Sequence, residues 1–435
     1  MIRILYPLAM RLLVPAALLN LWWRGRREPG YRQHLSQRFG FGPSASAPGF
    51  WIHAVSVGEI QAVTPLVRAL RLRYPQTPVT LTTSTAAGAA RARALFGAEL
   101  AVRYLPWDLP GSVRRFFDRV QPQLAIIVEK ELWPVLYREC GRRGVPLLLA
   151  SAALASRSLP RYRRLWPLYR RTALEGLHVA AQSTEDAARF ADLGIPAARI
   201  HVTGNLKFDT EIGADRLAAG RALRAQWGLG DGFLLVAGST YEAEEDALLE
   251  IRRLLSERGV AVSLVLAPRH APRFESVAAR LQSAGVPFRR RSHSTEPLAG
   301  ASGGSPVLLL DTLGELTPFY AAAEAAFVGG SLVPDVGGHN LLEPAALGIP
   351  ILTGPQGFNA PDIVSALVAE GAAQIVTDAV SMAAAIEQLA RDPAERRRRG
   401  GAGQQFVERN RGTLARTLAI IESIRAAASS RPASR

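Results

Sequence analysis

The chain has 435 residues, 48% of them hydrophobic, and this length and composition predict two globular domains. Its formal net charge of +15 calls for an anionic partner, such as nucleic acid, anionic lipid or a phosphorylated substrate. The single cysteine, Cys140, excludes an internal disulfide. The sequence has neither zinc-type Cys/His spacing nor an RNA-binding aromatic signature, so we expect no nucleic acid partner.

The first 27 residues are predicted to form a membrane anchor. Residues 4–23 are apolar apart from one arginine and one asparagine, end in two tryptophans, and are followed by three arginines. Tryptophan suits the membrane interface and arginine suits the cytoplasmic side. The uninterrupted apolar core, Leu12–Leu19, is too short to span a hydrocarbon layer of about 30 Å by itself. We expect a segment that crosses once or lies in the interface, and a helix docked on the folded body is the alternative.

Apolar runs that predict strands alternate with helical patterns in the first half. These runs are Phe50–Val55, Val79–Thr83, Leu124–Val128, Pro146–Ala150 and Val179–Gln182. After the first run, apolar residues recur at helical spacing from Ile60 to Leu70. The alternation is typical of a parallel, doubly wound sheet, and it predicts an N-terminal Rossmann-like domain over residues 28–209.

A second set of strands begins after Asp209. Its members are Phe233–Ala237, Ser263–Ala267, Val307–Leu310, Ala326–Val328 and Pro350–Thr353. A long helical pattern, Ala394–Ala426, follows, and the Ser/Arg-rich residues 427–435 are predicted to be a disordered tail. We therefore expect an α/β chain whose second Rossmann-like domain, residues 210–426, faces the first across a cleft. Ligands would bind at the carboxyl ends of the strands.

Glu59 opens the helix that follows the first predicted strand. Gly58 permits a tight turn there, so a carboxylate lies at the carboxyl end of a buried strand, where a general base would be well placed. The alternative is a first-turn glutamate that only complements the helix dipole. Two more carboxylates, Glu129 and Glu131, directly follow the strand Leu124–Val128. They are candidate site residues, with helix capping as the alternative.

Lysine is nearly absent from this chain. Of 52 lysines and arginines, only Lys130 and Lys207 are lysine. A lysine kept against that bias indicates a task that arginine performs badly, because a compact ammonium differs from a planar guanidinium in reach and hydration. Lys207 lies at the predicted domain junction, which makes it a candidate for stabilising transferred charge. Chance survival of a surface lysine is the alternative.

The stretch Phe327–Pro355 reads as a strand, a glycine-rich turn, a short helix and a second strand. The glycines would let a ligand approach backbone N–H groups, and Asn340 is a natural N-cap for the short helix. A helix N-terminus is well matched to a phosphate. Glu343, one turn into the helix, could accept hydrogen bonds from ribose hydroxyls. The combination favours a nucleotide-sugar site over an ordinary βαβ turn.

Three further motifs each follow an apolar strand, so all three should border the same cleft. They are Gly238–Thr240, Pro268–His270 and Asp311–Glu315. Arg269 could pair with a phosphate or carboxylate. His270 could donate to a phosphate or satisfy a loop carbonyl.

These motifs together resemble the Kdo transferases of lipopolysaccharide synthesis, where Kdo is 3-deoxy-D-manno-oct-2-ulosonic acid. The segments that carry the resemblance are Ser56–Glu59, Glu129–Pro134, Gly204–Asp209, Gly238–Thr240, Pro268–His270, Asp311–Leu316 and Gly337–Ala345. The ordered set covers essentially the whole chain and is highly specific, although any one motif is not.

The resemblance implies an inverting glycosyltransferase of the GT-B type, held by its N-terminal anchor at the cytoplasmic face of the inner membrane. It implies transfer of Kdo from CMP-Kdo, bound by the C-terminal domain, to the lipid A precursor (lipid IVA), bound by the N-terminal domain. It implies Glu59 as the proton acceptor, Glu129 and Lys207 as transition-state stabilisers, and Glu131 as a further candidate. The CMP-Kdo-binding residues that it implies are Ser239, Pro268, Arg269, His270, Leu313, Gly314, Glu315, Asn340, Leu341, Leu342 and Glu343.

The chain departs from the family pattern at four places. Lys130 replaces a usual threonine, Val135 an asparagine and Tyr241 a histidine, and the stretch Ala150–Ser158 lacks a usual asparagine and arginine. These changes cluster in the first domain. They therefore bear on the acceptor and on the number of Kdo units more than on the donor.

The implied chemistry agrees with the residues. CMP-Kdo carries a phosphate and a carboxylate, to which Arg269, Lys207 and the helix end at Asn340 are complementary. No Asp-x-Asp motif is evident, and a single phosphate needs no bridging metal, so we expect no metal or other cofactor. The basic segment Arg157–Arg171, interleaved with aromatics, is predicted to contact phosphorylated lipid or anionic headgroups, unless it is a solvated helix face. A GT-B enzyme that uses a UDP-sugar (a GlcNAc transferase or epimerase) and a non-catalytic membrane-bound binding protein remain alternatives.

Overall fold

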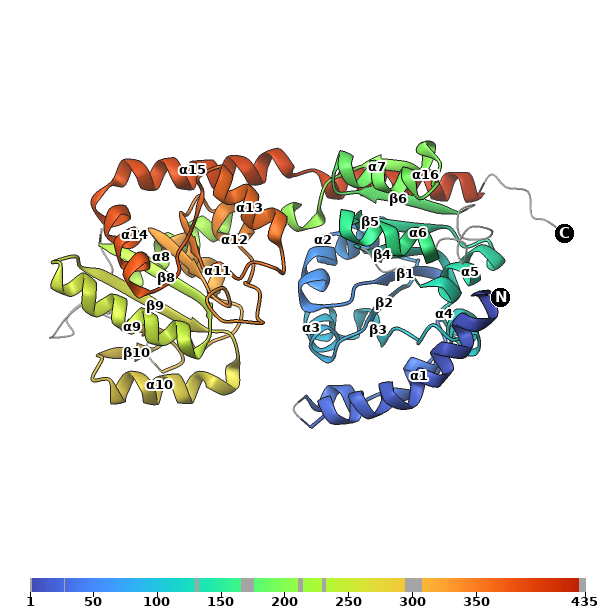
Figure 1. Cartoon of the computed structure of the whole chain (residues 1–435), viewed down its shortest axis with the longest axis horizontal. Coiled ribbons are helices and arrows are strands. Elements are labelled where there is room, and N and C mark those ends of the chain that lie inside the picture. The colour runs from blue at the N-terminus through green and yellow to red at the C-terminus, as the bar shows by residue number, and fades with distance from the viewer. Residues whose placement is uncertain are drawn as a thin grey trace. The chain divides into compact units, whose positions relative to one another are not determined.

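The computed structural model describes residues 2–26, 28–129, 133–165, 176–209, 214–228, 232–293 and 307–429. The chain divides into two compact units, which are shown in Figure 1. Unit 1 comprises residues 1–210 and 410–435, and unit 2 comprises residues 211–409. The chain therefore crosses from one unit to the other twice.

Unit 1 contains a sheet of seven strands in the order β3-β2-β1-β4-β5-β6-β7, with every neighbouring pair parallel. The strands are β1 Gly49–His53, β2 Val79–Thr83, β3 Ala101–Tyr104, β4 Pro122–Val128, β5 Leu147–Ala152, β6 Leu177–Ala181 and β7 Ile200–Val202. Its helices are α1 Ile2–Arg24, α2 Val57–Arg73, α3 Ala86–Phe96, α4 Pro110–Val120, α5 Pro134–Arg143, α6 Leu159–Leu165, α7 Thr184–Asp192 and α16 Thr413–Ser429.

Unit 2 contains a second sheet of seven parallel strands, in the order β10-β11-β9-β8-β12-β13-β14. The strands are β8 Phe233–Thr240, β9 Val262–Pro268, β10 Phe288–Arg290, β11 Val307–Leu309, β12 Ala325–Val328, β13 Ile351–Thr353 and β14 Ala373–Ile375. Its helices are α8 Ala214–Gln226, α9 Glu242–Glu257, α10 Phe274–Ser283, α11 Leu316–Ala322, α12 Leu342–Ala346, α13 Pro361–Ala369, α14 Ala379–Arg391 and α15 Pro393–Asn410.

Helices cover both faces of each sheet, which is why the central strands are apolar without alternation. In unit 1, α4, α5 and α7 pack on the face that contains Trp51, whereas α2, α3 and α16 pack on the face that contains Phe50 and Ile52. In unit 2, α9, α10 and α14 cover one face and α11 covers the other. The predicted pair of doubly wound parallel sheets is confirmed.

All ten predicted strands are present, and the structure adds four that the sequence does not predict. These four, β3, β7, β10 and β14, are the two edges of each sheet. An edge strand has one partner and is partly exposed, as in β7 and β10, where no residue is fully buried. The apolar run that marks a central strand is therefore missing at an edge.

The end of the predicted C-terminal domain is wrong. The helical pattern Ala394–Ala426 is two helices, α15 and α16, separated at Gly412, whose φ of 89° a continuing helix does not allow. α16 belongs to unit 1, because Ile421 and Ile424 pack with Phe50 and Ile52 in its core. An apolar helix face does not specify which of two sheets it will cover.

Asp209 joins the two places where the chain passes between the units. It stands next to Thr210, where the chain leaves unit 1, and its side chain accepts the backbone N–H groups of Gly412 and Leu414, where the chain returns. The Gly412 bond is 2.7 Å long. One carboxylate therefore caps α16 and fixes it to the end of the first segment of unit 1.

α1 is long and apolar enough to cross a membrane by length and composition, and within the described part of the chain it is the one such helix. It lies along unit 1 (Figure 1). Near its start Tyr6 Oη donates to Asp108 at 2.9 Å, and at its end Arg24 donates to Tyr31 Oη at 2.6 Å. Its other side exposes leucines and tryptophans, with Leu12 74% and Trp23 58% exposed.

Replacing Asp209 by alanine should lower the free energy of unfolding by about 1–2 kcal/mol, because α16 loses its N-terminal cap. Urea denaturation measures the change. The control is Glu422→Ala on the same helix. Glu422 forms an exposed ion pair with Arg73 at 2.8 Å, and its loss should cost less than about 1 kcal/mol. Equal losses for the two variants would contradict a special role for Asp209.

Candidate active site

Glu59 lies in the first turn of α2, at the carboxyl end of β1. Ser56 is the N-cap, and its hydroxyl donates to Glu59 Oε1 at 3.2 Å while accepting the Glu59 N–H. Glu59 Oε2 accepts the backbone N–H of Val55 at 2.7 Å. These hydrogen bonds hold a half-buried carboxylate at the edge of the sheet. Glu59 therefore has a structural role at the start of α2, and the same hydrogen bonds hold its carboxylate in a defined position.

Lys207 and Glu129, which stand 78 positions apart, form an ion pair in the structure. Lys207 Nζ donates to Glu129 Oε1 at 2.8 Å, and the two side chains are 28% and 22% exposed. Glu129 directly follows β4 and has a φ of 61°, which is unusual for a residue with a side chain. Glu131 and Lys130 lie outside the described residues.

A chain of hydrogen bonds positions the backbone around Lys207. Asn205 Oδ1 accepts the Lys207 N–H at 3.0 Å, and Asn205 Nδ2 donates to Gln182 Oε1 at 3.0 Å. Gln182 Nε2 in turn donates to the carbonyl of Ser151, and Ser151 Oγ accepts the N–H of Leu206. Ser151 lies near the end of β5, while Gln182 and Asn205 follow β6 and β7, so the carboxyl ends of three neighbouring strands support one lysine.

Lys207 sits in a 3₁₀ turn, η7 (Leu206–Asp209), which packs against both α2 and α16. α2 is the helix that Glu59 opens. The structure therefore brings Glu59, Glu129 and Lys207 to the same edge of the unit 1 sheet. Asp209, at the end of η7, fixes this turn to α16.

His53, in the same motif as Glu59, is an interior residue. Its side chain is fully buried, and Nδ1 lies 3.1 Å from the carbonyl oxygen of Thr82 and 3.0 Å from its hydroxyl. Burial lowers the pKa of His53 to about 4, so it is neutral at pH 7. It supports β1 from within.

In unit 2, four aromatic and basic side chains gather at the carboxyl ends of β8 and β9. The ring of Tyr241 stacks on His339 with centroids 5.9 Å apart, and its hydroxyl lies 3.4 Å from His270 Nε2. Burial, together with the charges of the nearby Arg269 and His270, lowers the pKa of His339 to about 4. Tyr241, a departure from the family pattern, is the ring that links the two histidines. Ser239, two residues before it, has a φ of 59°.

The glycine-rich turn after β12 is filled from inside by Glu244. This fully buried carboxylate accepts four backbone N–H groups, from Tyr241, Gly330, Ser331 and Leu332, at 2.8–3.0 Å. A Cβ on Gly329 would lie 2.8 Å from Glu244 Oε2, so that glycine makes room for an internal carboxylate. The sequence argument that all of these glycines admit a ligand is wrong at Gly329.

The helix after this turn begins one residue later than the sequence predicts. Leu341 is the N-cap of the five-residue α12, and Asn340 Oδ1 accepts the N–H of Leu342 at 3.1 Å from the preceding position. Asn340 Nδ2 donates to Glu343 Oε1 at 3.1 Å, and Thr317 Oγ1 donates to Glu343 Oε2 at 3.3 Å. Leu341 and Leu342 are 2% and 3% exposed, so their side chains face the core.

The remaining predicted residues follow β9 and β11. Pro268 ends β9, and the Arg269 N–H donates to the carbonyl of Thr240, the last residue of β8. Leu313 is 76% exposed and Gly314 has a φ of 87°. Glu315 accepts from Arg291 at 2.8 Å. Within the described ranges, no group of three His, Cys, Asp or Glu side chains could hold a metal ion.

Comparison with known proteins identifies the family. A family model described as 3-deoxy-D-manno-octulosonic-acid transferase (kdotransferase) matches residues 33–210. The 3-deoxy-D-manno-octulosonic acid transferase of Haemophilus influenzae is 37% identical over 97% of this chain and 98% of its own length. The enzyme of the same name from Bordetella pertussis is 39% identical over 97% and 99%. The chain belongs to the 3-deoxy-D-manno-octulosonic acid transferase family. It is therefore a glycosyltransferase.

The fold of this transferase agrees with more distant structures. The S. aureus MnaA–UDP co-structure superposes with a TM-score of 0.54 over 89% of this chain and all of that chain, at 13% identity. Identity this low shows the fold alone, which is the GT-B arrangement of two Rossmann-like domains.

Several residues that hold the candidate site together were not predicted from the sequence. Glu244, Gln182 and Ser151 make hydrogen bonds only to the chain itself and belong to no motif that stands out in one sequence. Glu244 had a local signal, since a glutamate three residues into a helix is the usual partner of a capping box. Its three bonds to the turn after β12 have no local signal, because they join positions 86 to 88 apart.

Replacing Glu244 by glutamine should destabilise the protein by about 2–3 kcal/mol, because an NH₂ group would face backbone donors that now share a carboxylate. Thermal and urea unfolding measure this loss. Glu242→Gln on the same helix is the control. Glu242 is 70% exposed and pairs with Arg280, so we expect a change below about 1 kcal/mol. Unchanged stability of Glu244→Gln would show that the turn does not need the carboxylate.

Proposed function

We infer that this protein transfers Kdo from CMP-Kdo to the lipid A precursor in lipopolysaccharide biosynthesis, by a single inverting displacement. Membership of the family over nearly the full length supports the reaction. The observation that carries the assignment to this chain's own residues is the Glu129–Lys207 pair, which joins two predicted catalytic motifs in one ion pair beside the helix that Glu59 opens.

Glu59 is the proposed general base. The N–H of Val55 and the hydroxyl of Ser56 hold its carboxylate at the carboxyl edge of the sheet, where ligands bind in sheets of this kind. Its task would be to take the proton from the acceptor hydroxyl as that oxygen attacks the anomeric carbon. Positioning by two hydrogen bonds lowers the cost of orienting the base before reaction.

Lys207 and Glu129 are the proposed stabilisers of the transition state. As the bond to the phosphate breaks, positive charge develops on the sugar ring and negative charge on the leaving group. A carboxylate and an ammonium held at 2.8 Å can respond to both charges at once. The hydrogen bond from the Lys207 N–H to Asn205 Oδ1 fixes the backbone from which the ammonium group extends.

The CMP part of the donor would bind unit 2 near Arg269. Within the described residues Arg269 has no carboxylate partner, so its charge is available to a phosphate. His270, Asn340 and Glu343 offer polar groups for the nucleotide, and Gly314 with the exposed Leu313 offers a backbone edge. Because one arginine can neutralise a single phosphate, we propose that transfer needs no metal ion.

We propose that α1 attaches the enzyme to the cytoplasmic face of the inner membrane by lying in the interface. Tyr6 near one end of α1 and Arg24 at the other are both hydrogen-bonded to unit 1, while the leucines on its outer side are exposed. A helix held near both ends by a folded domain is suited to lie in the plane of the interface instead of crossing it. The basic segment Arg157–Arg171 contributes no structural argument, because residues 166–175 lie outside the described residues.

The function is tested by mass spectrometry of the product formed from CMP-Kdo and a tetra-acylated lipid A precursor. The wild-type enzyme should add Kdo, and Glu59→Gln should be slower by about a hundredfold or more while still binding CMP-Kdo. Glutamine can keep the hydrogen bonds to the Val55 N–H and the Ser56 hydroxyl, so the variant should fold. Glu99→Gln, which alters an exposed ion pair, is the control. Transfer from UDP-GlcNAc and not from CMP-Kdo would overturn the proposed donor, and normal turnover of Glu59→Gln would overturn the base.

Lys207→Arg should lower kcat by about tenfold or more, because a planar guanidinium cannot occupy the position of the ammonium beside Glu129. Lys130→Thr, which restores the usual family residue, is the control and should have a much smaller effect. Steady-state kinetics with CMP-Kdo separates kcat from KM. If Lys207→Arg keeps the wild-type kcat, the lysine has no role in catalysis, and its presence in a chain nearly free of lysine is due to chance.

A further inference from the structure

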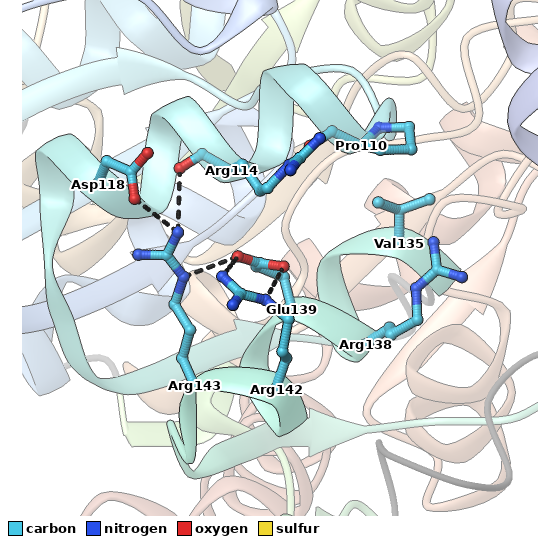
Figure 2. Close-up of a pocket in the computed structure, with 8 residues that line it drawn as sticks. All are labelled: Pro110, Arg114, Asp118, Val135, Arg138, Glu139, Arg142 and Arg143. Carbon is cyan, nitrogen blue, oxygen red and sulfur yellow. Dashed lines mark hydrogen bonds and ion pairs between the residues drawn. The ribbon is translucent and has the colours of Figure 1, made fainter.

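A groove lined by four arginines lies between α4 and α5 in unit 1, on the sheet face opposite to α2 (Figure 2). We call it the arginine groove. Its cations are Arg114 on α4 and Arg138, Arg142 and Arg143 on α5, and its anions are Asp118 and Glu139. The hollow has a volume of about 450 Å³, enough for a phosphate group and its substituents.

Two of the four arginines form ion pairs with the two carboxylates of the groove. Arg142 bonds Glu139 in a bidentate pair at 2.6 and 2.9 Å, and Arg143 bonds Glu139 at 2.7 Å and Asp118 at 2.6 Å. Figure 2 shows these pairs at the centre and at one end of the groove. Both carboxylates of the groove are thus paired with Arg142 and Arg143, and neither forms an ion pair with Arg114 or Arg138.

Arg114 and Arg138 lie at the other end, near Pro110 and Val135 (Figure 2). Neither has a carboxylate within ion-pair distance among the residues that the structure describes. Arg114 makes only a long bond of 3.4 Å to the carbonyl of Pro110. Arg138 interacts electrostatically with the buried Asp108 without an ion pair. Two guanidinium groups on opposite walls of a hollow, neither in an ion pair within the described residues, are suited to hold a phosphate between them.

The apolar helix α1 reaches this end of the groove. Tyr6 of α1 donates to Asp108, and the same buried carboxylate accepts the N–H groups of Val135 and Leu136 at the start of α5. Asp108 also stands two residues before Pro110, the first residue of α4. The start of α1 and this end of the groove are therefore tied to the same carboxylate.

We propose that the arginine groove binds the phosphate of a membrane phospholipid headgroup, with Arg114 and Arg138 as the contacting residues. The proposal rests on the proposed attachment of the enzyme to the membrane surface. The groove then fixes the orientation of unit 1 on the membrane, because α1 supplies apolar burial without a specific contact and the two arginines supply a directed one.

Co-sedimentation of the full chain with phosphatidylcholine vesicles that contain a minor fraction of phosphatidylglycerol tests the proposal. At about 0.1 M salt, Arg114→Gln/Arg138→Gln should bind about tenfold more weakly than wild type. The control is Arg68→Gln/Arg397→Gln, which removes the same charge from two exposed arginines on α2 and α15. It should stay within about twofold of wild type.

The outcomes separate the groove from the attachment itself. If the wild type does not bind these vesicles, the membrane attachment falls and the groove proposal falls with it. If the wild type binds and both double variants lose affinity equally, net charge is sufficient and the groove is refuted. If Arg138→Gln unfolds the protein, the exposed Arg114→Gln alone carries the test, with an expected loss of about threefold.

Two further measurements separate the sources of phosphate. Calorimetric titration with glycerol phosphate should give weak binding. If glycerol phosphate binds tightly to the wild type, and Arg114→Gln/Arg138→Gln binds vesicles as strongly as the wild type does, the site serves a soluble phosphate and the lipid assignment is wrong.

Kdo transfer to a detergent-dispersed acceptor should be unchanged in Arg114→Gln/Arg138→Gln, because the groove is separate from Glu59 and Lys207. A loss there would assign the groove to the acceptor's own phosphate.

Discussion

The carboxylate of Asp209 is the contact on which the arrangement of unit 1 depends. The chain leaves unit 1 beside this residue and returns at Asn410, and the carboxylate accepts the N–H of Gly412, 203 positions away in the sequence. The returning α16 completes a core that includes Phe50 of β1. Gly204, with a φ of 94°, lets α16 approach, since a Cβ there would lie 2.6 Å from Thr413 Oγ1. Lys207 lies in the chain between Gly204 and Asp209, which both contact the start of α16. The position of the proposed catalytic lysine therefore depends on the far end of the chain.

Other carboxylates in the two units also accept backbone N–H groups and so hold loops at the edge of a sheet. Glu244 accepts the N–H groups of the turn after β12, Asp108 accepts those at the start of α5, and Asp186 accepts that of Leu154 at 2.8 Å. Each is a buried acidic side chain that bonds to backbone donors. Because acidic residues are used inside in this way, while many arginines lie at the surface, the exterior is more basic than the formal charge of +15 suggests. An enzyme whose proposed substrates and membrane are all anionic gains long-range attraction from that surface.

Much of the fold and part of the site could be read from the sequence because the sheets are parallel. A strand buried on both faces needs an unbroken apolar run, and all ten central strands have one. The residues just after such runs must then meet at one edge, which is why Glu59, Glu129 and Arg269 could be singled out without a structure. The retention of Lys207 in a chain nearly free of lysine pointed to the same edge from composition. Edge strands such as β7 and β10 escaped this reasoning, because half-exposed strands carry no such run.

The sequence by itself determined which residues follow each strand, and hence which side chains reach the carboxyl edge of each sheet. Only the tertiary structure decided which of them touch. Lys207 meets Glu129, Glu244 fills a glycine turn that looks like a ligand site, and α16 returns to unit 1 although it follows unit 2 in the chain. Local periodicity encodes burial and secondary structure over a few residues. Contacts between positions tens to hundreds of residues apart are set by packing and by backbone donors that need acceptors, and neither leaves a pattern in the local sequence.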